Sequence, residues 1–272
     1  MPELPEVETT RRGIEPHIAG RRIQQLLVHE PRLRWTVDAD LPAAVAGQRV
    51  QGVRRRAKYL LIDLEDGSSL LLHLGMSGSL RVLPQDTPRL THDHVDLLLD
   101  SGQVLRFNDP RRFGSLHRIE GDAEAHPLLR KLAPEPLGEG FDAAYLFRVT
   151  RRKRVAIKLL VMNSHLVVGV GNIYASEALF RAGIRPGRAA KSLTRDDCGR
   201  LVKAIRAVLA MAIRFGGTTL RDYVGADGKP GYFRRKLHVY ERAGEPCRRC
   251  ATPIRQTVQG QRSTYYCPEC QS

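Results

Sequence analysis

Short apolar runs separated by polar turns dominate the first part of the chain. Six runs rich in Leu, Val and Ile occupy residues 23–29, 48–54, 59–64, 69–74, 94–99 and 103–107. The turn dipeptides Asp66-Gly67 and Ser101-Gly102 stand between neighbouring runs, as they do in antiparallel hairpins. Because almost no helical period interrupts these runs, the pattern predicts an antiparallel β-sandwich or barrel.

A helical pattern precedes the strands. Val7, Ile14 and Ile18 fall roughly on one face of a helix, and Gly20 ends the segment. Pro5 suits the first helical turn, where its missing N–H costs no hydrogen bond, and the carboxylates around it oppose the positive end of the helix dipole. The opening residues therefore predict a helix start.

The period changes after a stretch rich in proline and glycine at residues 132–140, which predicts a linker. Three helices are expected beyond it, at residues 141–149, 154–162 and 172–182. A fourth begins at Thr194, which has capping-box spacing to Asp197, and ends before Gly216-Gly217. Strands followed by helices predict an α+β protein.

The charge balance indicates a polyanionic partner. Lys and Arg number 44 against 29 acidic residues, which gives a formal net charge of +15 and a pI near 10.1. Basic residues cluster at 54–58, at 151–154 and between 229 and 262. Neutralising phosphates is the simplest use of such clusters, so nucleic acid is favoured over an anionic membrane. With no apolar run of about 20 residues and no signal-peptide pattern, we expect a cytoplasmic protein without a membrane partner.

Cysteine spacing gives a second chemical signal. Cys247-x-x-Cys250 is followed, after sixteen residues, by Cys267-x-x-Cys270. This is the spacing of a four-thiolate structural zinc site, whereas two disulfides would suit an oxidising compartment. Four protein ligands close the coordination sphere, so one Zn²⁺ would hold a small ribbon together and do no chemistry. Cys198 lies on the apolar stripe of the last helix and is expected to be buried.

The first residues also permit a chemical interpretation. If Met1 is removed, Pro2 becomes a terminal secondary amine beside Glu3 and Glu6. Alpha-amino groups titrate near ~8, so a useful fraction is neutral and nucleophilic at physiological pH. Residues 2–8 are therefore either a helix start or a nucleophile with acids around it, and both can hold at once.

Six further motifs occur along the chain in a fixed order together with the paired cysteines. They are PELPEVE at 2–8, RRRAKYL at 54–60, HLGMSG at 73–78, NDPRRFG at 108–114, VGVGNIYA at 168–175 and DGKPGYF at 227–233. In this combination the chain resembles the bacterial formamidopyrimidine-DNA glycosylases over nearly its whole length.

The resemblance implies a base-excision enzyme that removes oxidised purines, 8-oxoguanine and formamidopyrimidines, from damaged double-stranded DNA and then cuts the abasic strand. It also implies a monomer. The damaged base must leave the stack before its sugar can be reached. In the family, the residues that match Met76, Arg111 and Phe113 fill the resulting gap.

The resemblance also assigns catalytic roles. Pro2 is the expected nucleophile that forms a Schiff base with the sugar, Glu3 assists opening of the sugar ring, and Glu6 orients the site. Lys58 matches the proton donor for β-elimination, and Arg262 the residue assigned to δ-elimination. Since arginine essentially never deprotonates, we expect Arg262 to bind and polarise the departing phosphate.

The remaining implied residues bind DNA. They are His73, His92, Lys153, Lys158 and Asn172. Read from the residues alone, Lys153 and Lys158 would be a solvated helix face. Residues 255, 261 and 262 are expected near the tip of the zinc ribbon, and residues 217–233 form the loop that closes over the flipped base.

These observations give a predicted domain organisation. Residues 1–131 form the catalytic β-sandwich with its N-terminal helix, and 132–140 the linker. Residues 141–225 form a helix–two-turn–helix domain, 226–244 the lesion-recognition loop and connection, and 245–272 the zinc ribbon.

Two rival functions remain open. The related endonuclease VIII group would keep the chemistry but act on oxidised pyrimidines. A non-enzymatic zinc-ribbon protein that binds nucleic acid would account equally well for the charge and the cysteines. Leu4 after Pro2-Glu3, the motifs around Met76, Arg111 and Phe113, and the loop at 229–233 favour oxidised purines over pyrimidines. Only the N-terminal residues and their combination with those motifs argue against the non-enzymatic protein.

Overall fold

The computed structural model describes residues 2–218 and 233–272 of the chain. The chain divides into two compact units, one comprising residues 1–130 and 215–232 and the other residues 131–214 and 233–272. Residues 219–232 lie outside the described residues, and they include most of the loop at 217–233 that is predicted to close over the flipped base. Among the described residues, no helix is both long and apolar enough to cross a bilayer.

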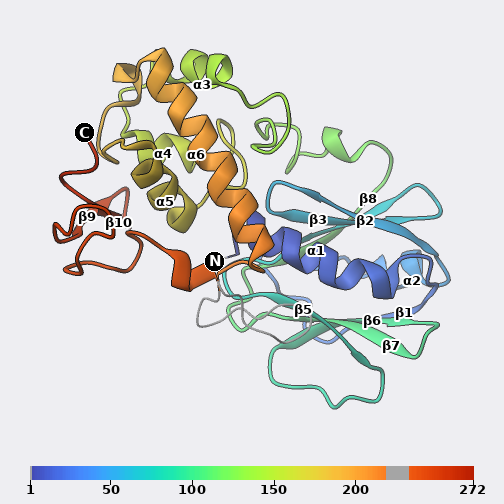
Figure 1. Cartoon of the computed structure of the whole chain (residues 1–272). Helices are drawn as coiled ribbons and strands as arrows, with labels where there is room; N and C mark the ends of the chain where they lie inside the picture. Colours follow the sequence, from blue (N-terminus) through green and yellow to red (C-terminus); the bar gives the residue numbers. More distant parts are fainter. Residues whose placement is uncertain (1, 219–232) are drawn as a thin grey trace. The chain divides into compact units, whose positions relative to one another are not determined.

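The first unit contains two antiparallel sheets and an N-terminal helix (Figure 1). Its helices are α1 (Leu4–Ile18), α2 (Leu41–Val45) and the 3-10 turn η1 (Ala123–Ala125). Its strands are β1 (Ile23–Val28), β2 (Val50–Arg56), β3 (Tyr59–Leu64), β4 (Ser69–His73), β5 (Ser79–Pro84), β6 (Asp93–Leu99), β7 (Gln103–Asn108) and β8 (Ser115–Ile119). The sheets have the orders β1-β6-β7-β5 and β2-β3-β4-β8. The predicted sandwich is confirmed, and each of the six predicted runs is a strand.

One apolar core fills this unit. Side chains from both sheets, such as Leu60, Leu97 and Phe107, join one cluster with Ile14 and Ile18 of α1. Helix α1 packs against β2 and β5, which are edge strands of the two sheets. A helix at these edges protects their unpaired backbone groups and fixes where the N-terminal residues lie.

A buried ion network supports the loop between β5 and β6. The guanidinium of Arg106 on β7 donates two hydrogen bonds to the Asp96 carboxylate, at 2.8 and 3.0 Å. It also donates to the backbone carbonyls of Thr87 and Pro88 in the loop. Because Arg106 is buried, removing it would leave an uncompensated carboxylate. The loop that leads to His92 is therefore tied to the sheet beneath it.

The second unit is helical and ends in a two-stranded ribbon. It contains α3 (Ala143–Thr150), α4 (Ile157–Val161), α5 (Asn172–Ala182), η2 (Ala190–Ser192), α6 (Arg195–Arg214), η3 (Phe233–Lys236), β9 (Arg255–Gln259) and β10 (Arg262–Tyr266). The predicted capping box at the start of α6 is confirmed, because Thr194 and Asp197 each accept a hydrogen bond from the other's backbone N–H. Cys198 is fully buried, as predicted. Helix α4 is shorter than the predicted 154–162.

Candidate functional site

The N-terminal acids form a tight buried cluster. Pro2 is buried and Met1 lies outside the described residues. Glu3 and Glu6 are 2% and 0% exposed. Glu6 accepts the Glu3 N–H at 2.9 Å on one carboxylate oxygen and the Thr218 N–H at 2.8 Å on the other. Glu6 therefore joins the start of α1 to a residue more than two hundred positions away, and both predicted interpretations of residues 2–8 remain compatible with this geometry.

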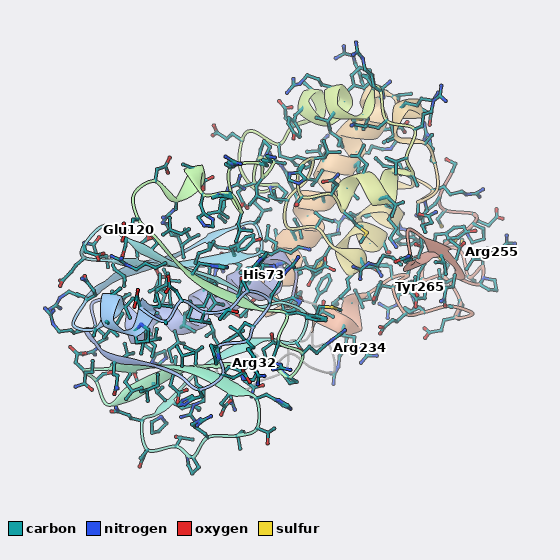
Figure 2. The ribbon with its side chains drawn as sticks, turned by 180° about the vertical axis from the view of Figure 1, so that it is seen from behind. Arg32, His73, Glu120, Arg234, Arg255 and Tyr265 are labelled. Atoms are coloured by element: carbon teal, nitrogen blue, oxygen red, sulfur yellow. The ribbon has the colours of Figure 1, made fainter. Side chains whose placement is uncertain are left out.

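Lys58 and His73 lie at the same end of the sheet β2-β3-β4-β8. Lys58 is half-buried in the turn between β2 and β3, where Ala57 has a positive φ of 54°. Tyr59, the next residue, is the cross-strand partner of His73 at the end of β4, and their rings lie 4.8 Å apart. His73 is labelled in Figure 2. Besides burial, the positive charge of Lys58 contributes to lowering the pKa of the His73 imidazole.

His73 is held neutral and in one tautomer. Burial lowers the pKa of His73 to about 4, with further contributions from the charges of Lys58 and Arg34. Its Nδ1 accepts the backbone N–H of Gly75 at 3.0 Å. A neutral imidazole that accepts at Nδ1 carries its proton on Nε2. His73 is therefore a hydrogen-bond donor without a net charge, suited to an oxygen acceptor.

A buried carboxylate organises the loops that carry Met76, Arg111 and Phe113. Asp109 is fully buried, accepts the Ser77 hydroxyl at 2.7 Å on Oδ1, and accepts the Gly114 N–H at 2.8 Å on Oδ2. Ser77 follows Met76, and Gly114 follows Phe113. One carboxylate thus fixes the positions of the two loops relative to each other.

The backbone of Asp109 extends this arrangement to a third loop. Its N–H donates to the carbonyl of His92 at 3.0 Å, and its carbonyl lies 2.9 Å from Nε2 of His94. His92 has a positive φ of 72°, an uncommon conformation for a residue with a side chain. The loops of Met76, His92, Arg111 and Phe113 therefore all meet at Asp109.

Close backbone approach requires glycine at the junction of two of these loops. A Cβ on Gly75 would lie 2.4 Å from the Gly114 nitrogen, and Gly75 also has a positive φ of 68°. Beyond this junction Phe113 is 44% exposed, and the Arg111 guanidinium lies 5.0 Å from the centre of its ring. Met76 is half-buried. The close-packed backbone at Gly75 and Gly114 thus carries the neighbouring side chains of Met76, Arg111 and Phe113.

Sequence reasoning assigned no role to Asp109, Thr218 or Arg34. Asp109 lies inside a quoted motif, so an acidic residue directly before a proline in a turn was a usable signal. Thr218 donates its backbone N–H to Glu6, and no side-chain pattern reveals a backbone donor. Arg34 acts through its charge on His73 and Tyr59. Its position follows from a long-range bond of its N–H to the carbonyl of Gly114.

In the second unit, three predicted residues converge on the ribbon. The ammonium of Lys158 donates to the carbonyl of Ser263 at 2.9 Å and to the Thr264 hydroxyl at 2.6 Å. The side-chain amide of Asn172, the first residue of α5, donates to the same Ser263 carbonyl at 3.0 Å. Ser263 directly follows Arg262, which is exposed. Lys158 and Asn172 therefore fix the backbone that presents Arg262.

The burial of Lys158 differs from its expected surroundings. Lys158 is 0% exposed, so the interpretation of a solvated helix face is wrong for this residue, whereas Lys153 is exposed. At the ribbon, Gln261 lies in the turn and Arg262 begins β10, but Arg255 pairs with Tyr266 at the opposite end of the hairpin. The expectation that Arg255 lies near the tip is therefore wrong.

The four paired cysteines are arranged for a metal ion. The sulfur atoms of Cys247, Cys250, Cys267 and Cys270 all lie within 4.8 Å of one another. Three of the separations are 3.9, 3.5 and 3.4 Å. Tetrahedral zinc with Zn–S bonds of about 2.3 Å requires sulfur atoms about 3.8 Å apart, so the donor set and its spacing fit Zn²⁺.

The site defines a class of protein. A β-sandwich carries a buried N-terminal acid cluster and the loops of Met76, Arg111 and Phe113, which are anchored on Asp109. A helical unit carries Arg262 on a four-cysteine ribbon. Family models match each part: the formamidopyrimidine-DNA glycosylase N-terminal domain at residues 1–116, its H2TH domain at 132–224, and a zinc finger found in FPG and IleRS at 244–272. The chain binds one structural Zn²⁺ through its four cysteines.

Full-length relatives agree with these models. The formamidopyrimidine-DNA glycosylase of Thioalkalivibrio sulfidiphilus is 65% identical over 100% of both chains. The crystal structure of the MutM (FPG) protein of Thermus thermophilus is 42% identical, with a TM-score of 0.89 over 99% of this chain and 98% of that one. A Lactococcus lactis FPG mutant, solved with DNA containing Fapy-dG, is 35% identical, with a TM-score of 0.92 over 99% of both chains. The chain belongs to the formamidopyrimidine-DNA glycosylase family.

Removing the Asp109 carboxylate should destabilise the first unit. In Asp109→Ala, the buried Ser77 hydroxyl and Gly114 N–H lose their acceptor, and each unsatisfied group costs about 1–3 kcal/mol. Asp109→Asn should cost less, because its amide oxygen still accepts one donor. Urea unfolding of the three proteins measures the difference, and an alanine variant as stable as the parent would contradict the role of Asp109.

His73 should make stability depend on pH. Its pKa is about 4 in the folded protein and ~6.5 when unfolded. Below pH ~6.5 the unfolded chain binds a proton that the folded chain does not, so stability is full above that pH and falls towards pH 4. NMR titration of the imidazole should give the low midpoint. His73→Gln should show a shallower loss of stability than the parent between pH 7 and 5, and equal slopes would contradict the assignment.

Zinc removal should unfold the ribbon alone. Folding and metal binding are coupled in such small sites, so a strong chelator should release one zinc per chain and raise amide exchange in residues 245–272. The strands of the sandwich should keep their protection, since their core contains no cysteine of this set. Unchanged exchange in the ribbon after verified metal loss would show that the thiolates are not a folding element.

Proposed function

We propose that this chain is a base-excision DNA repair enzyme that removes oxidised purines from duplex DNA and cuts the resulting abasic strand. The observation that carries the proposal is the relative from Lactococcus lactis, which matches 99% of this chain and was solved with DNA containing Fapy-dG. The excised bases are 8-oxoguanine and formamidopyrimidines.

The first chemical step uses the N-terminus. After loss of Met1, the neutral Pro2 amine attacks C1′ of the damaged nucleotide. The bond from C1′ to the base breaks, its electron pair leaves with the base, and the proton of the amine passes to the departing base. Glu3 donates a proton to the ring oxygen as the sugar opens, and the nitrogen becomes an iminium. A secondary amine has no further proton to lose at this point, so the iminium carries a charge. Glu6, which binds the Glu3 N–H, holds Glu3 in place.

The charged iminium makes the second step possible. It acidifies C2′, so water takes a proton from that carbon, the electron pair forms the C2′–C3′ double bond, the C3′–O bond breaks and the 3′ phosphate departs. Lys58 serves as the proton donor for this β-elimination. A second elimination releases the 5′ phosphate, and Arg262 binds and polarises that leaving group. Both phosphates leave as anions, which the high net positive charge of the protein accommodates.

The remaining residues open and grip the duplex. Met76, Arg111 and Phe113 replace the extruded base, and the anchoring of their loops on Asp109 keeps them ordered without DNA. His73, His92 and Lys153 bind phosphates. Lys158 and Asn172 act on the DNA through the ribbon backbone that presents Arg262, because both donate to Ser263. Neutral His73 can bind a phosphate oxygen through Nε2–H.

The domain organisation and state of assembly belong to the same proposal. We place the catalytic sandwich at 1–131, the linker at 132–140, the helix–two-turn–helix domain at 141–225, the lesion-recognition loop and connection at 226–244, and the ribbon at 245–272. The enzyme acts as a monomer on chromosomal DNA in the cytoplasm and needs no membrane.

A trapping experiment tests the substrate and the chemistry together. Incubation with duplexes that carry 8-oxoguanine opposite cytosine, followed by borohydride, should reduce the iminium and leave a covalent protein–DNA adduct. A duplex with thymine glycol opposite adenine should trap less. Preference for thymine glycol would favour an endonuclease VIII-like specificity, and no adduct on either duplex would exclude the enzyme.

The nucleophile has its own control. Pro2→Gly, or a form that retains Met1, should lose the trapped adduct and still bind the duplex, because both keep Arg111, Phe113 and the ribbon. Mass spectrometry of the peptide that carries the reduced adduct should place it on residue 2. Full trapping by the form that retains Met1 would reduce Pro2 to a helix-start residue.

A further inference from the structure

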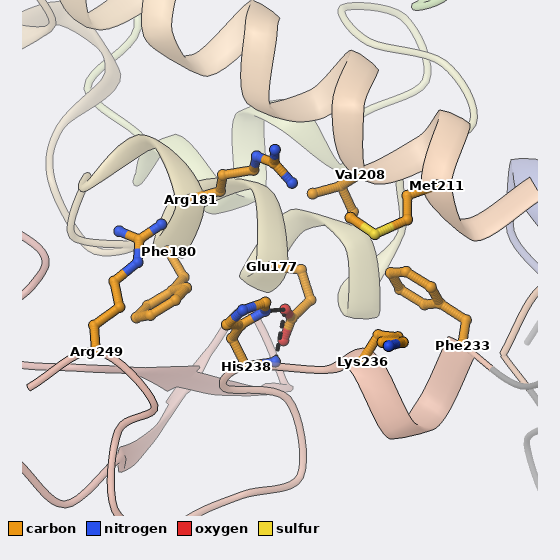
Figure 3. A pocket seen from close by; sticks show the side chains of 9 residues that line it. All are labelled: Glu177, Phe180, Arg181, Val208, Met211, Phe233, Lys236, His238 and Arg249. Carbon is orange, nitrogen blue, oxygen red and sulfur yellow. Dashed lines mark hydrogen bonds and ion pairs between the residues drawn. The ribbon is translucent and has the colours of Figure 1, made fainter. Parts of the chain in front are cut away.

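A cavity of about 280 Å³ lies within the second unit. Helices α5 and α6, the turn η3 and the first cysteine knuckle contribute to its wall (Figure 3). The lining includes Phe180, Val208, Met211 and Phe233, which form an apolar floor. Phe233 is the last residue of the motif at 227–233, and the proposed function gives no role to Phe180, Val208 or Met211.

The one acid in the wall is already compensated. Glu177 accepts the backbone N–H groups of His238, Val239 and Tyr240 at 2.9, 2.9 and 3.0 Å. Its side chain is 3% exposed, and Nδ1 of His238 lies 3.4 Å away. Three amides and an imidazole therefore face its negative charge, and the charge does not dominate the mouth of the cavity.

Cations surround the mouth. Arg181, Lys236 and Arg249 are all exposed and line the cavity, and Figure 3 shows their charged groups around the apolar floor. In the part of the chain that the structure describes, neither Arg181 nor Arg249 has an acidic partner. Arg249 instead lies over the ring of Phe180, 4.6 Å from its centre. The mouth of the cavity therefore favours an anionic ligand.

Size and lining narrow the class of ligand. Cofactor and drug-sized sites span about 300–1,000 Å³, so this cavity lies at the lower limit of that range. An aromatic side chain fits, and the ring of Phe180 and the flexible thioether of Met211 offer it good partners. An apolar floor inside a cationic mouth matches an aromatic residue flanked by carboxylates.

The cavity is separate from the proposed DNA contacts of this unit. Asn172 begins α5, whereas Arg181 lies nine residues further along the same helix, about 13 Å away at 1.5 Å per residue. Substitutions at the cavity therefore leave the bonds from Lys158 and Asn172 to Ser263 untouched.

We propose that this cavity binds an acidic peptide segment of a partner protein, with one aromatic side chain seated on the floor and its neighbouring carboxylates paired with Arg181 and Arg249. The proposal goes beyond the proposed enzymatic function, since it gives the enzyme a protein-docking site. Recognition of this kind combines a buried aromatic anchor with an electrostatic rim.

A fluorescein-labelled oligo-aspartate peptide that ends in phenylalanine is the probe, measured by anisotropy with the zinc-loaded full chain and no DNA. It should bind, and raising the salt should weaken it. Met211→Trp, which fills the cavity, and Arg249→Glu or Arg181→Glu, which reverse its rim charge, should each weaken binding by about tenfold or more. Arg148→Glu makes the same charge change on α3 and should leave affinity within about twofold.

Peptide controls separate anchor from charge. Replacing the phenylalanine by alanine should weaken binding by about tenfold, as should replacing the aspartates by lysines. Equal binding of the alanine peptide, equal loss in Arg148→Glu, or no binding of the original probe would overturn the proposal. So would complete competition by oligo-thymidylate of equal charge, because the surface would then be a nucleic-acid contact. Borohydride trapping of 8-oxoguanine duplex by Met211→Trp should be unchanged, so this test stands apart from that of the enzyme.

Discussion

The working surface of the first unit depends on the hydrogen bonds of one buried carboxylate. The side chains that we propose to enter DNA must be exposed, so they cannot be positioned by their own burial. Asp109 resolves this by holding the residues beside them, Ser77 and Gly114, and by binding His92 through its backbone. A buried carboxylate is stable only when its oxygen atoms accept hydrogen bonds. The hydrogen bonds to the side chain and backbone of Asp109 therefore also order three loops.

Buried polar groups play the same part elsewhere in the chain. Glu6 binds the Glu3 and Thr218 amides beside the proposed nucleophile, and Glu177 binds three amides where the chain enters the ribbon. Lys158 and Asn172 share one carbonyl next to Arg262. Glu6 and Glu177 each bind irregular backbone, which has no ladder of its own, whereas Lys158 and Asn172 bind a residue of β10 next to Arg262.

Most secondary structure was predictable from the sequence, and the exceptions have physical causes. β5 and β8 were not expected, and both are edge strands of their sheets. Such strands are buried on fewer sides, so β8 carries His117 and Arg118 and β5 carries Arg81 and ends at Pro84. The short helix α2 offered too few residues for a helical period. The central strands, with apolar residues at nearly every position, had no such ambiguity.

The sequence by itself determined the α+β class, the main helices, the zinc ligands and the family, because periodicity, cysteine spacing and ordered motifs are local in the chain. Only the tertiary structure decided that Lys158 is buried, that His73 is neutral, that Asp109 joins three loops, and that a cation-rimmed cavity lies beside Phe180. Each of these depends on contacts between residues far apart in the sequence. Burial and electrostatic environment are properties of such contacts, and no local pattern encodes them.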